Sequence, residues 1–219
     1  MPAPKKAYKG LPMEGIIATW YDRNAGRGRG FDRMAATVVS RLPPGGSVLE
    51  VAPGPGYLAI EIGKLGVERV AGLDISRSFV RIAGENARRA GVKLDVAHGD
   101  AAHMPYAGES FDYVVCSAAF KNFTDPVGAL VEMHRVLRPG GQASIFDLRR
   151  DASLEDIDAE VDRMQLSWAS AAFTRLSFRY LLLRNAYTLE QMEDMARRSR
   201  FGGGRLSTEG IGFELRLAK

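Results

Sequence analysis

The stretch Glu50-Val51-Ala52-Pro53-Gly54-Pro55-Gly56-Tyr57 decides the fold of this 219-residue chain. A β-rich run at 47–52 leads into two glycines, and a helical pattern begins directly after them. Glycines at such a junction allow a sharp turn and let a ligand approach the backbone, while free amides at a helix start favour anionic groups. The two prolines donate no amide, so we expect any donors to come from the glycines and Tyr57.

Short β-rich runs and helical segments alternate on both sides of this loop. Strands are expected at 47–52, 69–74, 93–97, 111–117 and 142–148, and helices at 31–42, 57–65, 78–90 and 127–137. Strands separated by helices imply crossover connections and a sheet covered on both faces. Residues 205–219 alternate in polarity around a turn at 209–210, which predicts a hairpin. The sequence therefore predicts an α/β fold: a doubly wound, mostly parallel seven-stranded sheet with an antiparallel C-terminal hairpin and a helical lid.

The segment after the fifth strand changes to a helical pattern. Ser153 and Asp156 have the spacing of a capping box, and an apolar stripe through Ile157, Val161, Met164 and Trp168 predicts one long helix. Thr188 with Gln191 predicts the start of the last helix. We therefore expect a single domain in this order: a flexible tail at 1–12, an N-terminal helical cap at 13–45, a ligand-binding core at 46–148, a helical insertion or lid at 153–187, and the last helix and hairpin at 188–219.

The composition is that of an ordinary globular protein. Hydrophobic residues make up 46% and charged residues 26% of the chain, which excludes collagen and disulfide scaffolds and disfavours disorder. The single cysteine, Cys116, cannot form an internal disulfide, and we expect it to be a small buried residue. No pattern of a signal peptide or membrane span is present, so the expected location is the reducing cytoplasm.

Positive charge is concentrated near the N-terminus. Up to Gly46 the chain has eight Lys or Arg against three acids, while the whole chain has 30 against 26. Such an arm would suit an anionic substrate or nucleic acid, although a solvated segment is the simpler interpretation.

Two carboxylates follow strands at the expected ligand edge. Asp74 ends the second strand 18 residues after Gly56, where it would accept both hydroxyls of a ribose; its alternative is a helix cap before Ser76. Asp100 follows the third strand and would read an adenine amine, or simply form a turn. The pattern Gly54-x-Gly56-x-x-Ala59 also fits a dinucleotide fingerprint, which by itself is a weak signal.

Five motifs in order resemble those of class I S-adenosylmethionine-dependent methyltransferases, in particular the small-molecule type of quinone biosynthesis. The resemblance covers roughly residues 46–148. The motifs are Glu50-x-Ala52-x-Gly54-x-Gly56, Asp74, Gly99-Asp100-Ala101, Phe111-Asp112-Tyr113-Val114-Val115 and Leu137-Arg138-Pro139-Gly140-Gly141. One departure is Ala52, which stands where the family usually has its first glycine; an alanine is accommodated if its φ is negative.

The resemblance implies S-adenosylmethionine as cofactor and a role for each motif. Glu50 and the loop of Ala52, Gly54 and Gly56 would face the methionine part, and Asp74 would bind the ribose. On the adenine side the implied residues are Ile75, Asp100 and Ala101; Ser117 would lie beneath the reacting methionine end, and Tyr21 would belong to a helix that closes over the cofactor.

The acceptor side is less defined by sequence. Methyl transfer in line with the sulfonium is driven mainly by proximity and orientation, and a base is needed only if the nucleophile starts protonated. Besides Tyr21, the acceptor candidates are Phe120, Lys121 and Asn122, although Phe120 also suits the core and we favour a solvated Lys121. Asp147 would either reach the pocket or pair with Arg149 or Arg150. The rings expected in an apolar wall, if they are not ordinary packing, are Trp20, Tyr21, Trp168, Phe173, Phe178 and Tyr180.

Several alternatives stay open at this point. The basic arm would suit an RNA-modifying methyltransferase, and the glycine pattern an NAD(P)-dependent oxidoreductase, although the chain lacks a Tyr-x-x-x-Lys dyad. A regulator that binds the cofactor without catalysis is a further alternative. The histidines are not spaced as metal ligands, so no metal is expected. The expected partner is a small-molecule acceptor, and the expected state is a monomer or homodimer.

Overall fold

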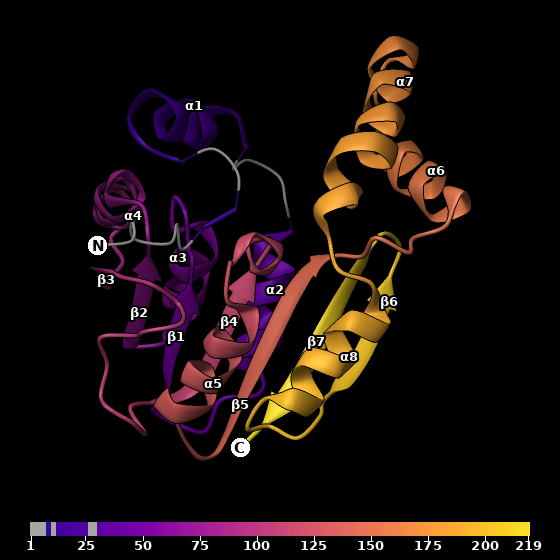
Figure 1. The fold of residues 1–219 in the computed structure, drawn as a ribbon. Helices are drawn as coiled ribbons and strands as arrows, with labels where there is room; N and C mark the ends of the chain where they lie inside the picture. Colours follow the sequence, from indigo (N-terminus) through magenta and orange to yellow (C-terminus); the bar gives the residue numbers. More distant parts are fainter. Residues whose placement is uncertain (1–7, 10–11, 26–29) are drawn as a thin grey trace, which may run out of the picture.

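The computed structural model describes residues 8–9, 12–25 and 30–219, and its centre is a seven-stranded sheet in the order β3-β2-β1-β4-β5-β7-β6 (Figure 1). Strands β1 to β5 run parallel, and β7 is antiparallel to both β5 and β6. This topology confirms the predicted doubly wound sheet and its C-terminal hairpin. The strands are β1 Ser47–Val51, β2 Arg69–Asp74, β3 Leu94–His98, β4 Phe111–Ser117, β5 Leu137–Leu148, β6 Arg205–Glu209 and β7 Gly212–Ala218.

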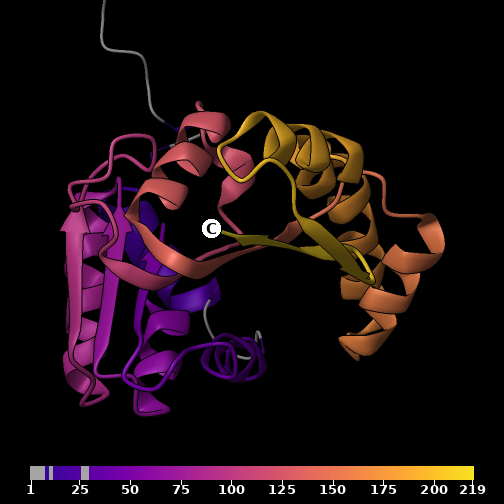
Figure 2. The same ribbon diagram turned by 90° about the horizontal axis from the view of Figure 1, so that it is seen from below.

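Helices cover both faces of the sheet (Figure 2). Helices α2 and α3 pack with Val48, Val70 and Tyr113 on one face, and α5 and α8 pack with Leu49, Val114 and other core residues on the opposite face. Every residue of β1 is buried, as expected for a central strand covered on both sides. The helices are α1 Gly15–Ala25, α2 Phe31–Val39, α3 Tyr57–Lys64, α4 Arg77–Arg89, α5 Pro126–Val136, α6 Leu154–Arg163, α7 Trp168–Ser177 and α8 Leu189–Arg198, with short turns η1 Phe120–Asn122, η2 Phe178–Leu182 and η3 Leu183–Asn185.

A polar cluster joins the end of α2 to the sheet. The guanidinium of Arg41 contacts the carboxylate of Glu214 on β7 and donates to Tyr113 Oη and Ser144 Oγ, both at 3.1 Å. Ser144 Oγ in turn donates to Glu214 Oε1 at 2.7 Å. Desolvation raises the pKa of Glu214, but the hydrogen bonds from Arg41 and Ser144 outweigh it and hold the pKa below its ordinary value. The cluster thus connects α2, β4, β5 and β7.

The predicted long helix after β5 is in fact two helices. Helix α6 ends at Arg163, Gln165 takes the left-handed conformation with φ +50°, and α7 begins at Trp168. Arg175 of α7 reaches back to Asp158 and Asp162 of α6 at 2.7 and 2.6 Å. The continuous stripe through Trp168 was therefore wrong, although both predicted capping boxes are present. Helices α6 and α7 form an arm that extends beyond the sheet (Figure 1).

The predicted flexible tail falls mostly outside the described residues, including Lys5 and Lys6 of the basic arm, and so do Arg27 and Arg29. Three residues of the tail are described, and two of them, Tyr8 and Lys9, pair with the turn after β4. Tyr8 forms an antiparallel bridge with Phe123, and the Lys9 amide donates to Asn122 O at 2.8 Å. In the described part of the chain, no helix is both long and apolar enough to cross a membrane.

Candidate active site

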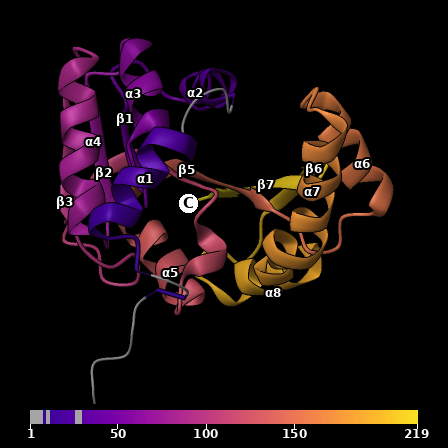
Figure 3. The ribbon, with the colours of Figure 1, turned by 90° about the horizontal axis from the view of Figure 1, so that it is seen from above.

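The carboxyl ends of β1 to β5 meet at one edge of the sheet, seen from above in Figure 3. The strand order reverses between β1 and β4, since β2 and β3 continue on one side and β5 on the other. In open α/β sheets this switch point is where ligands bind. The residues predicted to bind the cofactor, and the acceptor candidates Phe120, Lys121 and Asn122, lie on or beside this edge or on α1.

The glycine loop after β1 depends on its two glycines. Gly56 has φ +84°, and a side-chain carbon there would lie 3.0 Å from Ala83 Cβ of α4. Gly54 has φ +55°, and a side-chain carbon there would meet no atom of the described residues within 4 Å, so the space that they leave beside it is open. Both glycine amides donate within the protein, Gly54 N to Asp74 Oδ2 at 2.9 Å and Gly56 N to Pro53 O at 3.0 Å. The two glycine amides are thus donors, as expected, but their acceptors lie within the protein.

Ala52 adopts the left-handed conformation, with φ +58°. Its amide donates to Leu73 O at 2.7 Å, which holds the loop beside the end of β2. We expected an alanine to fit here only if its φ is negative. The structure gives a positive φ, so this condition is not met. An L-residue in this region costs about 1–2 kcal/mol relative to the right-handed one.

Ala52→Gly will raise the free energy of unfolding by about 0.5–1 kcal/mol, because relief of the left-handed strain exceeds the added entropy of an unfolded glycine. A gain of 1 kcal/mol corresponds to roughly 2–4 °C in Tm for a chain of this size. Urea denaturation is the measurement. The matched control is Ala159→Gly on the exposed side of α6, which should lose about 1 kcal/mol. Equal losses in both variants would contradict the assigned strain.

Asp74 links the loop after β1 to the turn after β2. Its carboxylate is only 4% exposed; Oδ2 accepts from Gly54 N and Oδ1 accepts from Ser76 N at 2.8 Å. Burial raises the pKa of Asp74 to about 6, against the lowering effect of the Ser76 and Gly54 amides. Ser76 itself caps α4 by accepting from Phe79 N. A carboxylate has about four acceptor positions, so the two amides leave capacity for two more donors.

Glu50 is buried beneath the glycine loop, and its Oε2 accepts from Ala59 N in the first turn of α3 at 2.8 Å. This contact ties β1 to the helix that follows the loop. Burial, the largest cause, raises the pKa of Glu50 to about 8; the Ala59 amide opposes the shift and the nearby Asp74 adds to it. The role implied for Glu50 toward the methionine part stays a prediction.

Glu50→Gln will flatten the pH dependence of stability. Between about pH 4.5 and 8 the folded protein keeps a proton on Glu50 that the unfolded chain has released, so the free energy of unfolding falls as pH rises. Removing this titration should raise the free energy of unfolding of the variant relative to that of wild type by on the order of 3–4 kcal/mol from pH 5 to pH 8. Urea denaturation across this pH range measures it. Glu68→Gln, at an exposed position, is the control; parallel curves for Glu50→Gln and wild type would contradict the expectation.

The residues predicted on the adenine side lie after β2 and β3. The Ile75 side chain is exposed at 38%, and its carbonyl lies 3.1 Å from His98 Nε2. Asp100 Oδ1 accepts from Ala102 N at 2.9 Å, so Asp100 does form the turn that was its alternative interpretation. Ala101 is partly buried against the core. Contact of these residues with an adenine stays a prediction.

On the acceptor side, the turn after β4 is more buried than the sequence suggested. Ser117 ends β4, and the Phe120 ring is fully buried, with its centroid 5.3 Å from that of Phe123. Lys121 Nζ pairs with Asp147 Oδ1 at 2.7 Å, with only 13% of the lysine side chain exposed. The preference for a solvated Lys121 was therefore wrong, and so was the pairing of Asp147 with Arg149 or Arg150. The two side chains meet because β4 and β5 are neighbours and end together.

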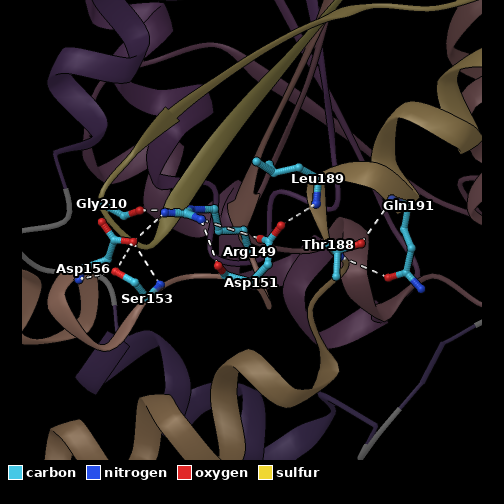
Figure 4. A network of polar contacts seen from close by, with 8 residues as sticks. All are labelled: Arg149, Asp151, Ser153, Asp156, Thr188, Leu189, Gln191 and Gly210. Carbon is cyan, nitrogen blue, oxygen red and sulfur yellow. Dashed lines mark hydrogen bonds and ion pairs between the residues drawn. The ribbon is translucent and has the colours of Figure 1, made fainter.

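Arg149 instead fixes the base of the arm, as Figure 4 shows. Its Nη2 donates to Asp156 Oδ2 of the α6 capping box at 2.6 Å, and its Nε donates to Gly210 O in the β6–β7 turn at 3.2 Å. Asp151 Oδ2 accepts from Leu189 N at the start of α8. The arm is thus anchored next to the carboxyl end of β5.

Helix α1 lies beside the glycine loop. The Tyr57 hydroxyl contacts both the carbonyl and the carboxylate of Asp22 at 2.8 Å, and Asn86 Nδ2 donates to the same carboxylate at 2.9 Å. Tyr21 packs edge-to-face on Phe79, with 5.7 Å between ring centroids.

The rings proposed as one apolar wall do not gather. Phe178 is buried in a small core with Ile157 and Val161, and Trp20 is exposed on α1. The remaining exposed rings of the set lie on the arm and its continuation: Trp168, Phe173 and Tyr180. Among the described residues, no group of three or more His, Cys, Asp or Glu side chains is placed to hold a metal ion.

Tyr8 was missed by the sequence analysis, although it lies near three of the site residues. Burial, followed by the nearby Asp74, Tyr21 and Asp147, raises the pKa of its phenol. The segment has no hydrophobic period, so its only signal was an aromatic residue between lysines.

Comparison with known proteins agrees with the fold and the motifs. Residues 49–145 match a family described as a methyltransferase domain. A demethylmenaquinone methyltransferase of Deinococcus radiodurans is 35% identical over 161 residues, covering 69% of this chain and 66% of the relative. A 2-phytyl-1,4-naphtoquinone methyltransferase of Synechococcus elongatus is 33% identical, covering 64% of this chain and 65% of the relative. The chain thus spans slightly less than two thirds of the length of these relatives.

Solved structures show the same architecture. The crystal structure of an S-adenosylmethionine-dependent methyltransferase from Aquifex aeolicus has a TM-score of 0.72 at 16% identity, covering 93% of this chain and 99% of that one. At 16% identity, this similarity shows a shared fold and nothing more specific. The comparisons support neither an RNA-modifying enzyme nor an NAD(P)-dependent oxidoreductase. The ordered motifs, the sheet topology and the match over the core place this chain in the class I S-adenosylmethionine-dependent methyltransferase family, where it is similar to the quinone-biosynthesis enzymes.

Proposed function

We propose that this protein transfers a methyl group from S-adenosylmethionine to a small, quinone-type acceptor. The observation that carries the proposal is Asp74, a buried carboxylate at the end of β2 that holds the glycine loop and keeps acceptor capacity for two hydroxyls. A ribose presents two neighbouring hydroxyls of this kind. The acceptor class is supported by the names of the relatives from Deinococcus and Synechococcus.

The residues present fit an adenosyl cofactor. Open space lies beside Gly54, next to the carboxylate of Asp74, so a ligand can approach the backbone there. Ile75 offers an exposed apolar surface one residue further along. We propose that Asp74 holds the ribose, that Ile75, Asp100 and Ala101 surround the adenine, and that Glu50, Ala52, Gly54, Gly56, Ser117 and Tyr21 complete the cofactor site.

The chain's own contribution to the reaction is positioning. When bound, S-adenosylmethionine supplies an electrophilic methyl group, whose bonding pair stays on sulfur while an electron pair of the acceptor forms the new bond. The protein holds the acceptor in line with that methyl, which by itself lowers the barrier by several kcal/mol. The Lys121–Asp147 pair keeps the turn after β4 in place, and Phe120 packs against Phe123 in the same turn. We propose that Asn122 and Tyr21 border the acceptor side.

Parallel thermal-shift titrations with S-adenosylhomocysteine, S-adenosylmethionine and NADPH test the cofactor. Ligand at about 100 times its Kd adds roughly 2.7 kcal/mol, which corresponds to about 5–10 °C in Tm. We expect a shift with the two adenosyl compounds alone. A shift with NADPH alone would overturn the proposal.

A transfer assay tests the acceptor class. The protein is incubated with methyl-labelled S-adenosylmethionine and the reduced form of 2-prenyl-1,4-naphthoquinone, and label is sought in the extracted naphthoquinone. The control substrate is total RNA under the same conditions. Label in RNA and not in the naphthoquinone would refute the small-molecule acceptor.

A further inference from the structure

Residues Tyr8 and Lys9, here called the strap, are tied to two distant segments of the chain. Tyr8 bridges Phe123, and Lys9 N donates to Asn122 O, so the strap adds a short antiparallel pairing to the turn after β4. The ammonium of Lys9 donates to Tyr187 Oη at 2.8 Å and lies 5.2 Å from the centre of that ring. The strap therefore has both a main-chain and a side-chain anchor.

The anchors place Tyr8 at the switch point of the sheet. Phe123 follows β4, and the turn that contains it is held to the end of β5 by the Lys121–Asp147 pair. Tyr8 is partly buried, and the carboxylates of Asp74, at the end of β2, and of Asp147, in β5, raise the pKa of its phenol. Strands β1 and β4 lie between β2 and β5 in the sheet order, and the bridge to Phe123 places Tyr8 beside the turn that follows β4, at the carboxyl edge of these strands.

The surroundings of Tyr8 also define its chemistry. Burial first, then the charges of Asp74, Tyr21 and Asp147, raise the pKa of the phenol above its ordinary value of 10.0. The hydroxyl is therefore protonated at neutral pH and acts as a hydrogen-bond donor instead of a base. Its ring offers a flat apolar surface next to that donor. A planar ring that carries a carbonyl or hydroxyl oxygen is the matching ligand.

Resting on the proposed function, we propose that Tyr8 is an acceptor-binding residue, delivered to the site by the strap, which packs against a quinone-type ring and donates its hydroxyl hydrogen to a ring oxygen. Lys9 is its positioning residue, because its ammonium holds the strap against Tyr187. Asp74 and the glycine loop serve the cofactor, and Tyr8 serves the other reactant.

Binding measurements on four variants test this assignment. Calorimetry first gives the Kd of S-adenosylhomocysteine, and then the Kd of oxidised 2-prenyl-1,4-naphthoquinone for the loaded protein. We expect Tyr8→Phe to weaken naphthoquinone binding about tenfold, as for loss of one hydrogen bond, and Tyr8→Ala to weaken it further. Lys9→Met should show a smaller loss in the same direction. S-adenosylhomocysteine affinity should stay within about twofold of wild type. The matched control is Tyr106→Phe, which removes a half-buried hydroxyl bonded to Gly72 O elsewhere.

Distinct results separate this inference from the proposed function. Unchanged naphthoquinone affinity in Tyr8→Phe and Tyr8→Ala overturns the assignment, as does an equal loss of S-adenosylhomocysteine affinity, which would make Tyr8 a cover for the cofactor. A wild-type protein that binds S-adenosylhomocysteine but not the naphthoquinone overturns this inference and leaves methyl transfer standing. A wild-type protein that binds neither contradicts both.

Discussion

Asp74→Asn will weaken the binding of S-adenosylhomocysteine by at least about 100-fold. An ionised carboxylate accepts two ribose hydroxyls, and hydrogen bonds to a charged group contribute about 1.5–3 kcal/mol each. The amide would also turn a donor toward Gly54 N or Ser76 N, each of which now donates to the carboxylate. Calorimetry measures the Kd, and circular dichroism checks that the variant is folded.

A matched control and a pH series make this result specific to Asp74. Asp95→Asn, on the exposed side of β3, should leave the Kd unchanged. Burial raises the pKa of Asp74 to about 6, and the ligand favours the ionised form, so wild-type affinity should fall as pH drops below about 6. The Asn variant should lose this pH dependence. Wild-type affinity in Asp74→Asn would remove Asp74 from the cofactor site.

Arg41→Met will lower the free energy of unfolding by about 2–3 kcal/mol, roughly 5–10 °C in Tm. The substitution leaves the Glu214 carboxylate without its cation in a mostly buried place, where Tyr113 and Ser144 also lose a donor. Because 19% of the Arg41 side chain and 16% of that of Glu214 stay exposed, we expect a smaller loss than for a fully buried pair. Urea denaturation measures it. The Kd of S-adenosylhomocysteine should not change.

A second substitution tests whether the loss comes from the pair. Arg41→Met combined with Glu214→Leu should recover part of the stability, because it removes the uncompensated carboxylate as well. The pKa of Glu214 is held below its ordinary value, so its share of the stability is present above about pH 4.5 and is lost as pH falls through the folded pKa. A double variant no more stable than Arg41→Met would contradict this account.

The parallel core follows from local sequence signals. The β1 strand, the glycine turn and the start of α3 were predicted together, since an apolar run, two glycines and a helical period occur within one stretch. The capping boxes at Ser153 and Thr188 were predicted because each needs only side chains three residues apart. Signals of this length do not depend on the rest of the fold.

Contacts between distant segments could not be predicted in the same way. Lys121 is adjacent to Asp147 only because β4 and β5 are neighbours with a particular register. Ala52 takes its left-handed φ where its amide donates to Leu73 O, a partner on another strand. Tyr8 pairs with Phe123 across more than half of the chain. The sequence thus indicates which residues lie at the edge of the sheet. Which of them come into contact depends on the order and register of the strands, which the local sequence does not contain.

The anchored base of the arm has a consequence for divergence among such proteins. The chain enters and leaves the arm at one point, where Arg150 N donates to Tyr187 O at 3.0 Å. The residues between these two belong to none of the strands of the sheet. A loop whose ends already touch can be lengthened, shortened or exchanged at little cost to the rest of the fold. We therefore expect the arm to vary in length and sequence among related proteins while the sheet and its carboxyl edge stay the same.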